Sequence, residues 1–508
     1  MKKIAWYLVF LVLLSSIGYV LVIKAKTFGV NPLKLDSGPI SGKTADGLRI
    51  YLGIPFAAPP VGELRWKAPQ PVKAWQEVKP CVAFGPACPQ PPVKKVGRMS
   101  EDCLYLNVWT PAKKADEKLA VMVFIYGGAF TIGAASEPYY NGAYLAKKGV
   151  VVVTFNYRVG PFGFLVHPLG LSGNYGLMDQ TAALKWVKRN IAAFGGDPDK
   201  VTIFGESAGS VSVALHLIMP ISQGLFRSAI AESGGPYGMR YVTPNADGSL
   251  EQALKMGEKF SQALKVTTLK EMRAKTSDEI LDIFNFSPSP FSPGMAFAPV
   301  FDGRIIPANP EKLYEDGQQA KVPVIIGSNA DEGNLFYEKV TVPVYKDYVK
   351  KLFGQNAAKV LAMFPATQES EVRSAFNCFL TAAMFSEPAR FVARAQEQKG
   401  RKSFLYKFTR VPKTGMAEQL GAFHSLELAY VLGNMKAQGG YDKTDVKLSE
   451  QIMDYWTNFA KTGDPNGPGL PLWPAYNSKA DENIEFGDSI RTNKNLLKKE
   501  CDLLRPMQ

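Results

Sequence analysis

The segment Gly205-Glu-Ser-Ala-Gly209 has the residue types and spacing of a nucleophilic turn. A serine held on a sharp turn between a strand and a helix needs small neighbours, because the flanking backbones pass close together. The turn exposes the hydroxyl, and the following helix offers its first N–H groups to a developing oxyanion. A β-rich run, Val201 to Phe204, precedes the pentapeptide, and an apolar helical run, Ser210 to Met219, follows it. Ser207 is therefore the predicted nucleophile.

A serine nucleophile needs a general base, and the chain contains three histidines. His216 lies on the same expected helix as Ser207, about 13.5 Å of rise away and half a turn out of phase. We expect it to be a packed, hydrogen-bonded helix residue. His167 lies in a Val-His-Pro turn and is expected to be a surface-loop residue. Elimination leaves His424, in the segment Gly421-Ala-Phe-His-Ser-Leu-Glu427, where a loop enters a helix.

The base in turn needs a carboxylate that fixes its tautomer and stabilises the imidazolium. A suitable acid lies just past the end of a strand, between the nucleophile and the histidine in chain order. The segment Gly327-Ser-Asn-Ala-Asp-Glu-Gly333 follows an expected strand and supplies Asp331 and Glu332. Spacing alone leaves both acids open, and either could be an ordinary loop acid that caps a helix.

An oxyanion hole needs backbone N–H groups that already point to the place where negative charge will form. The segment Phe124-Ile-Tyr-Gly-Gly-Ala-Phe130 ends an expected strand in a glycine-rich loop, in which peptide N–H groups can turn inward. The alternative is a tight turn without a function.

A scaffold that positions these groups is indicated by the alternation of apolar strands and helical patterns. Strands nearly continuous in Val, Ile and Phe, separated by helices, predict a parallel sheet covered on both faces. From Asp46 to Trp75, by contrast, we expect loops. We predict one α/β domain over residues 32–508 with long insertions. The expected strands are Leu104 to Trp109, Ala120 to Tyr126, Val150 to Asn156, Val201 to Phe204, Val322 to Gly327 and Phe404 to Phe408, and the expected helices include Ala143 to Lys148 and Asp179 to Ala193.

Composition is that of a globular protein, with 46% hydrophobic and 21% charged residues. The net charge of +13 is dispersed, and no groove-reading motif accompanies it, so we predict no nucleic-acid partner. No Cys-x-x-Cys pair occurs, and with three histidines this disfavours a structural zinc site.

The first 26 residues differ from the rest of the chain. Two lysines precede twenty uncharged residues, Ile4 to Ile23, and two more lysines follow. As a helix this run spans about 30 Å, the thickness of a bilayer core. Cleaved signal peptides have a shorter apolar region, and the small-residue site Ser16-x-Gly18 would leave Tyr19 at the mature end. We expect an uncleaved N-terminal apolar helix that anchors an exported body facing the periplasm or the extracellular side; a cleaved signal segment and a secreted protein are the alternative.

Five cysteines in an exported protein imply disulfides with one thiol left over. Cys88 and Cys103 would close a short loop rich in Pro, Lys and Gly, and this is the bridge that we predict. Cys81 is the competing partner, and Cys378 with Cys501 is a weaker second pair.

Together these features resemble the type-B carboxylesterases, the cholinesterase-like branch of the α/β-hydrolase fold. Phe194 to Gly209 is similar to the nucleophile signature of that family, and Glu101 to Val108 is similar to its second signature. The resemblance runs from about Gly38 to near the C-terminus. It includes Gly53 to Arg65, Asn156 to Arg158, Phe297 to Gly303 and Tyr455 to Asn466. The fold that it implies has a large, mostly parallel, twisted central sheet flanked by helices.

The resemblance also implies a role for each residue of a triad. Ser207 would be the nucleophile and His424 the general base. In the family pattern Asn-x-x-Glu-Gly the acid is the glutamate, which selects Glu332 over Asp331. Ser233, in Glu-Ser-Gly-Gly, resembles a buried serine that often supports the histidine–acid pair.

The oxyanion donors that the resemblance implies are the N–H groups of Gly128, Ala129 and Ala208. The implied reaction is hydrolysis of a small-molecule ester in two steps through an acyl-enzyme, without a metal or an organic cofactor.

Two features depart from the family pattern. Residues 89–102, between the two cysteines of the predicted bridge, carry three positive charges and no aromatic side chain, which argues against cation–π binding of choline. The N-terminal apolar run also fits an anchor better than a typical leader. A lipase, an esterase for polyester toxins and a non-catalytic adhesion protein of the same fold are the alternatives. The presence of Ser207, Glu332 and His424 argues against the last.

Overall fold

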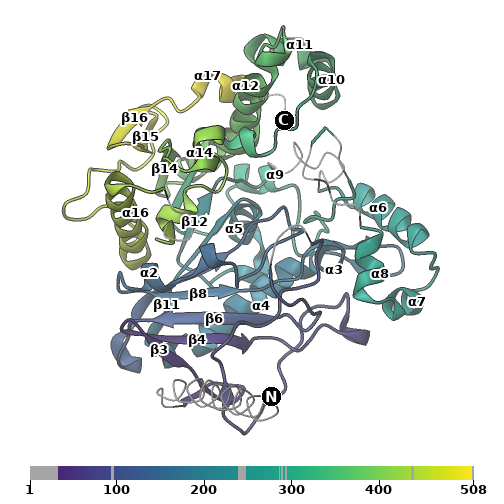
Figure 1. Ribbon diagram of the computed structural model, residues 1–508, viewed down its shortest axis with the longest axis vertical. Helices are drawn as coiled ribbons and strands as arrows, with labels where there is room; N and C mark the ends of the chain where they lie inside the picture. The colour runs from purple at the N-terminus through teal and green to yellow at the C-terminus, as the bar shows by residue number, and fades with distance from the viewer. Residues whose placement is uncertain are drawn as a thin grey trace, which may run out of the picture.

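A mixed sheet of eleven strands runs through the protein, as the computed structural model shows (Figure 1). The structure describes residues 32–92, 96–237, 248–284, 287, 290–291, 294–435 and 440–505, so the predicted anchor at residues 1–26 lies outside the described part. In spatial order the strands are β16 (Ile490–Lys494), β15 (Glu482–Phe486), β14 (Ser403–Phe408), β13 (Val324–Asn329), β12 (Ser228–Glu232), β11 (Gly196–Glu206), β7 (Leu119–Ile125), β8 (Val151–Phe155), β6 (Tyr105–Thr110), β4 (Leu48–Pro55) and β3 (Lys43–Ala45).

The sheet is parallel through its middle and antiparallel at both edges. In the order β8, β7, β11, β12, β13, β14, β15 each strand is parallel to the next. The pairs β3–β4, β4–β6, β6–β8 and β15–β16 are antiparallel. Every residue of β8 and β12 is buried. Successive side chains of a strand point to opposite faces, so both faces of the sheet are covered. The predicted α/β class and large sheet are confirmed, but the sheet is mixed.

Strand β4 contradicts the expectation of loops between Asp46 and Trp75. It pairs with both β3 and β6, and its register against β6 shifts between Tyr51 and Ile54. Gly53 lies in this irregular stretch at φ +75°, and its N–H donates to Asn107 Oδ1 at 3.0 Å. The glycine and the proline that ends the strand are turn signals in a sequence, and they hide a strand that bulges.

Helices surround the sheet and form two large insertions. Helices α6 to α8 follow β12 and lie at the right of Figure 1, and α10 to α12 follow β13 and lie at its top. The helices are α2 (Ala143–Ala146), α3 (Gly160–Phe164), α4 (Tyr175–Asn190), α5 (Ala208–Ile218), α6 (Leu250–Ala263), α7 (Leu269–Ala274), α8 (Ser277–Asp282), α9 (Pro310–Glu315), α10 (Val342–Phe353), α11 (Ala357–Met363), α12 (Glu369–Leu380), α13 (Glu387–Gln398), α14 (Gly415–Leu420), α15 (Leu428–Val431), α16 (Lys443–Thr462) and α17 (Lys498–Leu504). A π-helical turn, Thr381–Ser386, joins α12 to α13.

Two smaller sheets accompany the large one: a three-stranded sheet of β1 (Leu33–Lys34), β2 (Pro39–Ser41) and β5 (Lys79–Pro80), and a two-stranded sheet of β9 (Val166–His167) and β10 (Leu171–Ser172). Among the helices of the described residues, none has both the length and the apolar character needed to cross a membrane.

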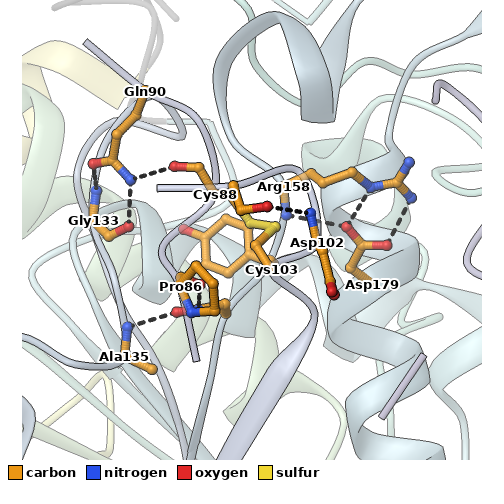
Figure 2. Close-up of a disulfide and its surroundings, with 12 residues drawn as sticks. Pro86, Cys88, Gln90, Asp102, Cys103, Gly133, Ala135, Arg158 and Asp179 are labelled. Carbon is orange, nitrogen blue, oxygen red and sulfur yellow. Dashed lines mark hydrogen bonds and ion pairs between the residues drawn. A yellow bond between two sulfur atoms is a disulfide. The ribbon is translucent and has the colours of Figure 1, made fainter. Parts of the chain in front are cut away.

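The predicted disulfide between Cys88 and Cys103 is present (Figure 2). Cys81 is a buried free thiol and does not compete for this bridge. The predicted pair of Cys378 and Cys501 is wrong, because both are free thiols, Cys378 exposed on α12 and Cys501 buried on α17.

Candidate active site

Ser207 occupies a strained turn between β11 and α5. Its backbone has φ 58° and ψ −124°, and the α-helix begins at the next residue. Non-glycine residues rarely adopt this conformation, so the surrounding structure must hold it. The N–H of Ser207 donates to the carbonyl oxygen of Glu232 at 2.9 Å, which ties the turn to the end of β12. The side chain is half-buried at the end of the central strand.

The glycines on either side of Ser207 are required by the end of strand β7. A Cβ atom on Gly209 would lie 1.9 Å from the carbonyl oxygen of Ile125, and one on Gly205 would lie 2.6 Å from the same atom. Real Cβ atoms do not approach backbone so closely. The Gly-x-Ser-x-Gly pattern therefore reflects the close passage of β7 behind the turn.

Glu332 and His424 meet in the structure, 92 residues apart in the chain. His424 Nδ1 lies 2.6 Å from Glu332 Oε2, and both side chains are buried. The other carboxylate oxygen of Glu332 accepts a hydrogen bond from the N–H of Asn329 at 2.7 Å. With one oxygen held by backbone, the carboxylate can fix the orientation of the imidazole.

Asp331, the other candidate acid, is hydrogen-bonded to backbone and side-chain amide groups. Its carboxylate accepts hydrogen bonds from the N–H of Ala422 at 2.9 Å and from Asn377 Nδ2 at 3.1 Å. It thus ties the acid loop to the loop that carries His424, and it does not contact the imidazole. Tertiary structure separates two acids that spacing left equivalent.

The other ring nitrogen of His424 faces Glu206, the residue just before Ser207. His424 Nε2 lies 3.1 Å from Glu206 Oε1. Among the described residues no hydrogen bond joins this nitrogen to the Ser207 hydroxyl. The imidazole thus lies at the turn that carries Ser207, with one carboxylate at each nitrogen. Sequence reasoning did not single out Glu206, although it lies within the pentapeptide itself.

Two aromatic rings pack on the imidazole. The ring centroid of Phe385 lies 4.9 Å from that of His424, and the centroid of Phe336 lies 5.1 Å from it. Phe385 belongs to the π-helical turn, and Phe336 follows the acid loop. π-helical turns are uncommon and often occur at functional sites. Here the turn directs an aromatic ring at the histidine.

Glu206 and Glu332, which contact His424, belong to a cluster of four buried glutamates that also includes Glu232 and Glu427. Burial, and then the charges of the other three glutamates, hold the pKa of Glu427 well above its usual range. Burial also raises the pKa of Glu232 to about 8. The hydrogen bond that its Oε1 accepts from Trp456 Nε1 at 2.9 Å lowers this pKa, but the effect of burial is larger. Like charges in a dry space cannot all ionise, so part of this cluster holds protons at neutral pH.

Ser233 contacts Glu427 and not the histidine–acid pair. Its Oγ donates to Glu427 Oε1 at 3.5 Å, and its backbone has φ 55°. The side-chain amide of Asn329 donates to the other oxygen of Glu427 and, at 2.8 Å, to the carbonyl of Phe423. Asn329 therefore links the acid loop to the histidine loop. Glu427 is the last residue of the segment 421–427 that contains His424, but nothing in the sequence indicates that its side chain is buried.

The two remaining histidines lie outside the site. His216 Nδ1 is 2.7 Å from Ser222 Oγ and its Nε2 is 3.0 Å from Gln180 Oε1. Burial lowers its pKa to about 3, and the prediction of a packed helix residue is confirmed. His167 is not a surface-loop residue: it is 7% exposed, lies in β9 beneath α6, and contacts Ser261 Oγ at 2.9 Å. The helix that covers it belongs to the insertion after β12, which the local sequence around His167 does not indicate.

The glycine-rich loop after β7 lies beside Ser207. A Cβ on Gly127 would lie 2.8 Å from the Cβ of Ser207. Gly128, Ala129 and Phe130 all have positive φ, at 108°, 55° and 59°. Three positive-φ residues in a row are uncommon when two of them are not glycine, so the loop turns sharply where it passes Ser207.

The orientation of the first of these peptide groups is held by its carbonyl. Gly128 O accepts hydrogen bonds from the N–H groups of Thr131 at 2.9 Å and Ile132 at 3.0 Å. The trans peptide is planar, so the N–H of Ala129 points in the opposite direction. Ala208 is the first residue of α5, and the first N–H groups of a helix have no partner within it. Within the described residues, no three His, Cys, Asp or Glu side chains are grouped to hold a metal ion.

Comparison with known proteins agrees with this architecture. The model of a family described as "Carboxylesterase family" matches residues 30–504. The chain belongs to the carboxylesterase family. Its relatives include the para-nitrobenzyl esterase of Bacillus subtilis (strain 168), which is 38% identical over 481 residues, covering 89% of this chain and 94% of that protein. The fumonisin B1 esterase of Sphingopyxis macrogoltabida is 35% identical over 490 residues, covering 91% of this chain and 87% of that protein.

A solved structure of a PNB esterase superposes on this carboxylesterase with a TM-score of 0.83 at 36% sequence identity, covering 94% of this chain and 100% of the other. The α/β-hydrolase fold is thereby confirmed, and the protein is a carboxylic-ester hydrolase of the serine type, as its sequence predicts.

Proposed function

We propose that Ser207, His424 and Glu332 form the catalytic triad of this esterase and act through an acyl-enzyme. The observation that carries the proposal is the 2.6 Å contact between His424 Nδ1 and Glu332, formed beside a serine on a strained turn. A carboxylate at Nδ1 keeps the proton there and leaves Nε2 free to act as a base.

In the first step Ser207 Oγ attacks the ester carbonyl carbon while His424 Nε2 takes the hydroxyl proton. Because Nε2 faces Glu206, the imidazole must turn toward Ser207 to take the hydroxyl proton. Catalytic hydrogen bonds are often long in ligand-free enzymes and tighten with substrate bound. The histidine then returns the proton to the departing alcohol.

The negative charge that forms on the carbonyl oxygen is taken up by the N–H groups of Gly128, Ala129 and Ala208. Water, deprotonated by the same histidine, then attacks the acyl carbon, and the histidine gives the proton to Ser207 Oγ as the C–O bond breaks and the acid is released. In both steps the imidazolium forms with the Glu332 carboxylate at Nδ1, which stabilises its positive charge.

The substrate class that we propose is a small, neutral carboxylic ester. Residues 89–102 lack an aromatic side chain, so this segment has nothing to hold a choline cation. A second candidate is an ester group of a larger polyester toxin, favoured by the similarity to a fumonisin B1 esterase.

Hydrolysis of p-nitrophenyl acetate by the wild type and by Ser207→Ala tests the proposal. Loss of the nucleophile is expected to lower kcat by about 10⁶-fold, with the protein still folded. A series of p-nitrophenyl esters of increasing chain length, an acylcholine and fumonisin B1 then defines the substrate. Equal inertness of both proteins across the series would favour the non-catalytic adhesion protein, and a preference for emulsified long-chain glycerides would favour a lipase.

We also propose that the enzyme is exported and anchored in a membrane by residues 1–26. The twenty uncharged residues between lysine pairs and the Cys88–Cys103 disulfide support this location. N-terminal sequencing of the protein extracted from membranes is the test, and a mature terminus at Tyr19 would contradict the anchor.

A further inference from the structure

The side chain of Gln90 is hydrogen-bonded to the C-terminal part of the glycine-rich loop that follows β7. We call this loop, residues 127–135, the oxyanion loop. The side chain is 1% exposed and lies two residues past Cys88. Its Oε1 accepts the N–H of Gly133 at 2.7 Å, and its Nε2 donates to the carbonyl of the same residue at 2.9 Å (Figure 2). The same Nε2 donates to Cys88 O at 3.0 Å. One amide thus pairs with both polar groups of one loop residue, as a neighbouring strand would.

Hydrogen bonds at Gly133 can fix the conformation of the whole oxyanion loop, because Gly133 packs tightly against the start of the loop. It has φ +124°, and a Cβ there would lie 2.6 Å from the Tyr126 ring and 2.9 Å from Gly127 O. The end of the loop therefore packs directly on its beginning. Ile132, the residue before Gly133, donates its N–H to Gly128 O. Ile132 therefore holds the Gly128–Ala129 peptide, and Ile132 is next to Gly133, the residue to which Gln90 is hydrogen-bonded.

A second side-chain amide acts on the same end of the loop. Asn156 is 3% exposed; its Oδ1 accepts the N–H of Ala135 at 2.9 Å and its Nδ2 donates to Pro86 O at 2.8 Å. Gln90 and Asn156 therefore both connect the oxyanion loop to the segment 86–90. This segment is joined through Cys88 to Cys103, which lies two residues before strand β6. The disulfide fixes the segment to the sheet.

We propose that Gln90 is a positioning residue for the oxyanion hole and that the Cys88–Cys103 disulfide influences catalysis through it. The inference rests on the proposed oxyanion donors. Without the amide, the buried N–H and C=O of Gly133 lose their partners, and such groups shift to find others. Oxyanion donors stabilise the transition state only while they are preorganised. Loosening the loop therefore lowers kcat more than it weakens substrate binding.

The first test is Gln90→Met, which keeps the length of the side chain and removes its polar atoms. Loss of a whole oxyanion donor costs about 10²- to 10³-fold in kcat, and we expect about 10-fold or more for a misaimed loop, with KM changed less than about threefold. The affinity for a trifluoromethyl ketone, which forms a tetrahedral adduct with serine, is expected to fall by the same factor as kcat/KM. The matched control is Gln319→Met, at a buried glutamine whose Nε2 donates to Ala395 O at 3.4 Å, which is expected to leave both quantities unchanged.

The second test is a cycle of Gln90→Met with the paired change Cys88→Ala and Cys103→Ala. If the disulfide acts through Gln90, the combined protein loses no more activity than the worse of the two parents. Losses that multiply would overturn the link to the disulfide. A folded Gln90→Met protein with kcat within twofold of wild type would overturn the positioning role.

Gln90→Glu serves where Gln90→Met does not fold. The carboxylate keeps an acceptor for the Gly133 N–H and, when protonated, can donate to the Gly133 carbonyl. The ratio of wild-type kcat to variant kcat is then expected to rise with pH, and a ratio independent of pH would count against the role. Ser207→Ala separates this inference from the proposed function. If Ser207→Ala is inactive while Gln90→Met resembles wild type, only the positioning role fails; if Ser207→Ala keeps full activity, the proposed function fails.

Discussion

The two sides of Ser207 are built from different interactions. On one side, His424 is held by carboxylates and aromatic rings: Glu332 at Nδ1, Glu206 at Nε2, and Phe336 and Phe385 against the ring. On the other side, the oxyanion loop is held by glycine packing, by backbone hydrogen bonds and by the neutral amides of Gln90 and Asn156.

This difference predicts which kinds of mutation will disturb each side of Ser207. Buried carboxylates interact over several ångströms in a low dielectric, so the histidine side responds to the loss of one charge and to pH. Neutral amides and close backbone packing do not titrate, and they respond to added volume or to a missing hydrogen bond. Three changes test this contrast.

Glu332→Gln is expected to have the largest effect, because it removes the charge that orients the imidazole and stabilises the imidazolium. We expect kcat to fall by about 10⁴-fold with little change in KM, as for the acid of other serine triads. Steady-state kinetics on p-nitrophenyl acetate measures it. Asp331→Asn is the matched control at the neighbouring acid, with a far smaller loss. A larger loss in the control would mean that the sequence-adjacent acid, and not Glu332, serves His424.

Gly209→Ala tests the packing side. The new methyl group would meet Ile125 O at 1.9 Å, a backbone atom of a central strand that cannot move aside. Overpacking of this kind costs about 3 kcal/mol, so the midpoint of thermal unfolding should drop and the Ser207 turn should distort. Gly415→Ala, at a helical glycine with no atom within 4 Å of an added Cβ, is expected to be neutral. An equally small change in the unfolding midpoint for Gly209→Ala and Gly415→Ala would show that strand β7 can move to accommodate the added methyl group.

Glu232→Gln is expected to have the smallest effect, visible only through pH. The pKa of Glu232 is raised to about 8 in the folded protein from 4.5, so between these values the folded state binds more protons than the unfolded state. Its contribution to stability is complete below about pH 4.5 and is lost as pH rises through 8. The variant, neutral throughout, should match the wild type at pH 5 and melt a few degrees above it at pH 9. Parallel melting curves of the two proteins from pH 5 to 9 would contradict the buried, protonated carboxyl.

Local pattern in the sequence predicted the elements next to Ser207 well. The β-rich run, the turn and the apolar helix follow one another in the chain, and the structure has β11, Ser207 and α5 in that order. Strand β4 escaped prediction because a bulge at Gly53 interrupts it. The environment of His167 escaped prediction because its cover, α6, comes from a distant insertion.

The carboxylates show the same limit. Glu206 and Glu427 lie inside segments that had been singled out, yet nothing in their neighbours in sequence indicates that both are buried around one histidine. Burial of a charged side chain depends on which strands and loops converge on it, and these come from four separate parts of the chain.

The sequence by itself predicted the disulfide that the structure contains and the nucleophile and base that we propose, because each rests on a short spacing or on the scarcity of one residue type. The small residues on either side of Ser207 form a recognisable local pattern, although strand β7 is what requires them, and three histidines leave few choices of base. The family pattern in the sequence selected Glu332 as the partner of His424, whereas only the tertiary structure decided that Asp331 ties the two loops together, that Glu206 faces the other nitrogen, and that Gln90 hydrogen-bonds to Gly133. Those outcomes depend on distances of 3.1 Å or less between strands and loops far apart in the chain, which spacing along a sequence does not encode.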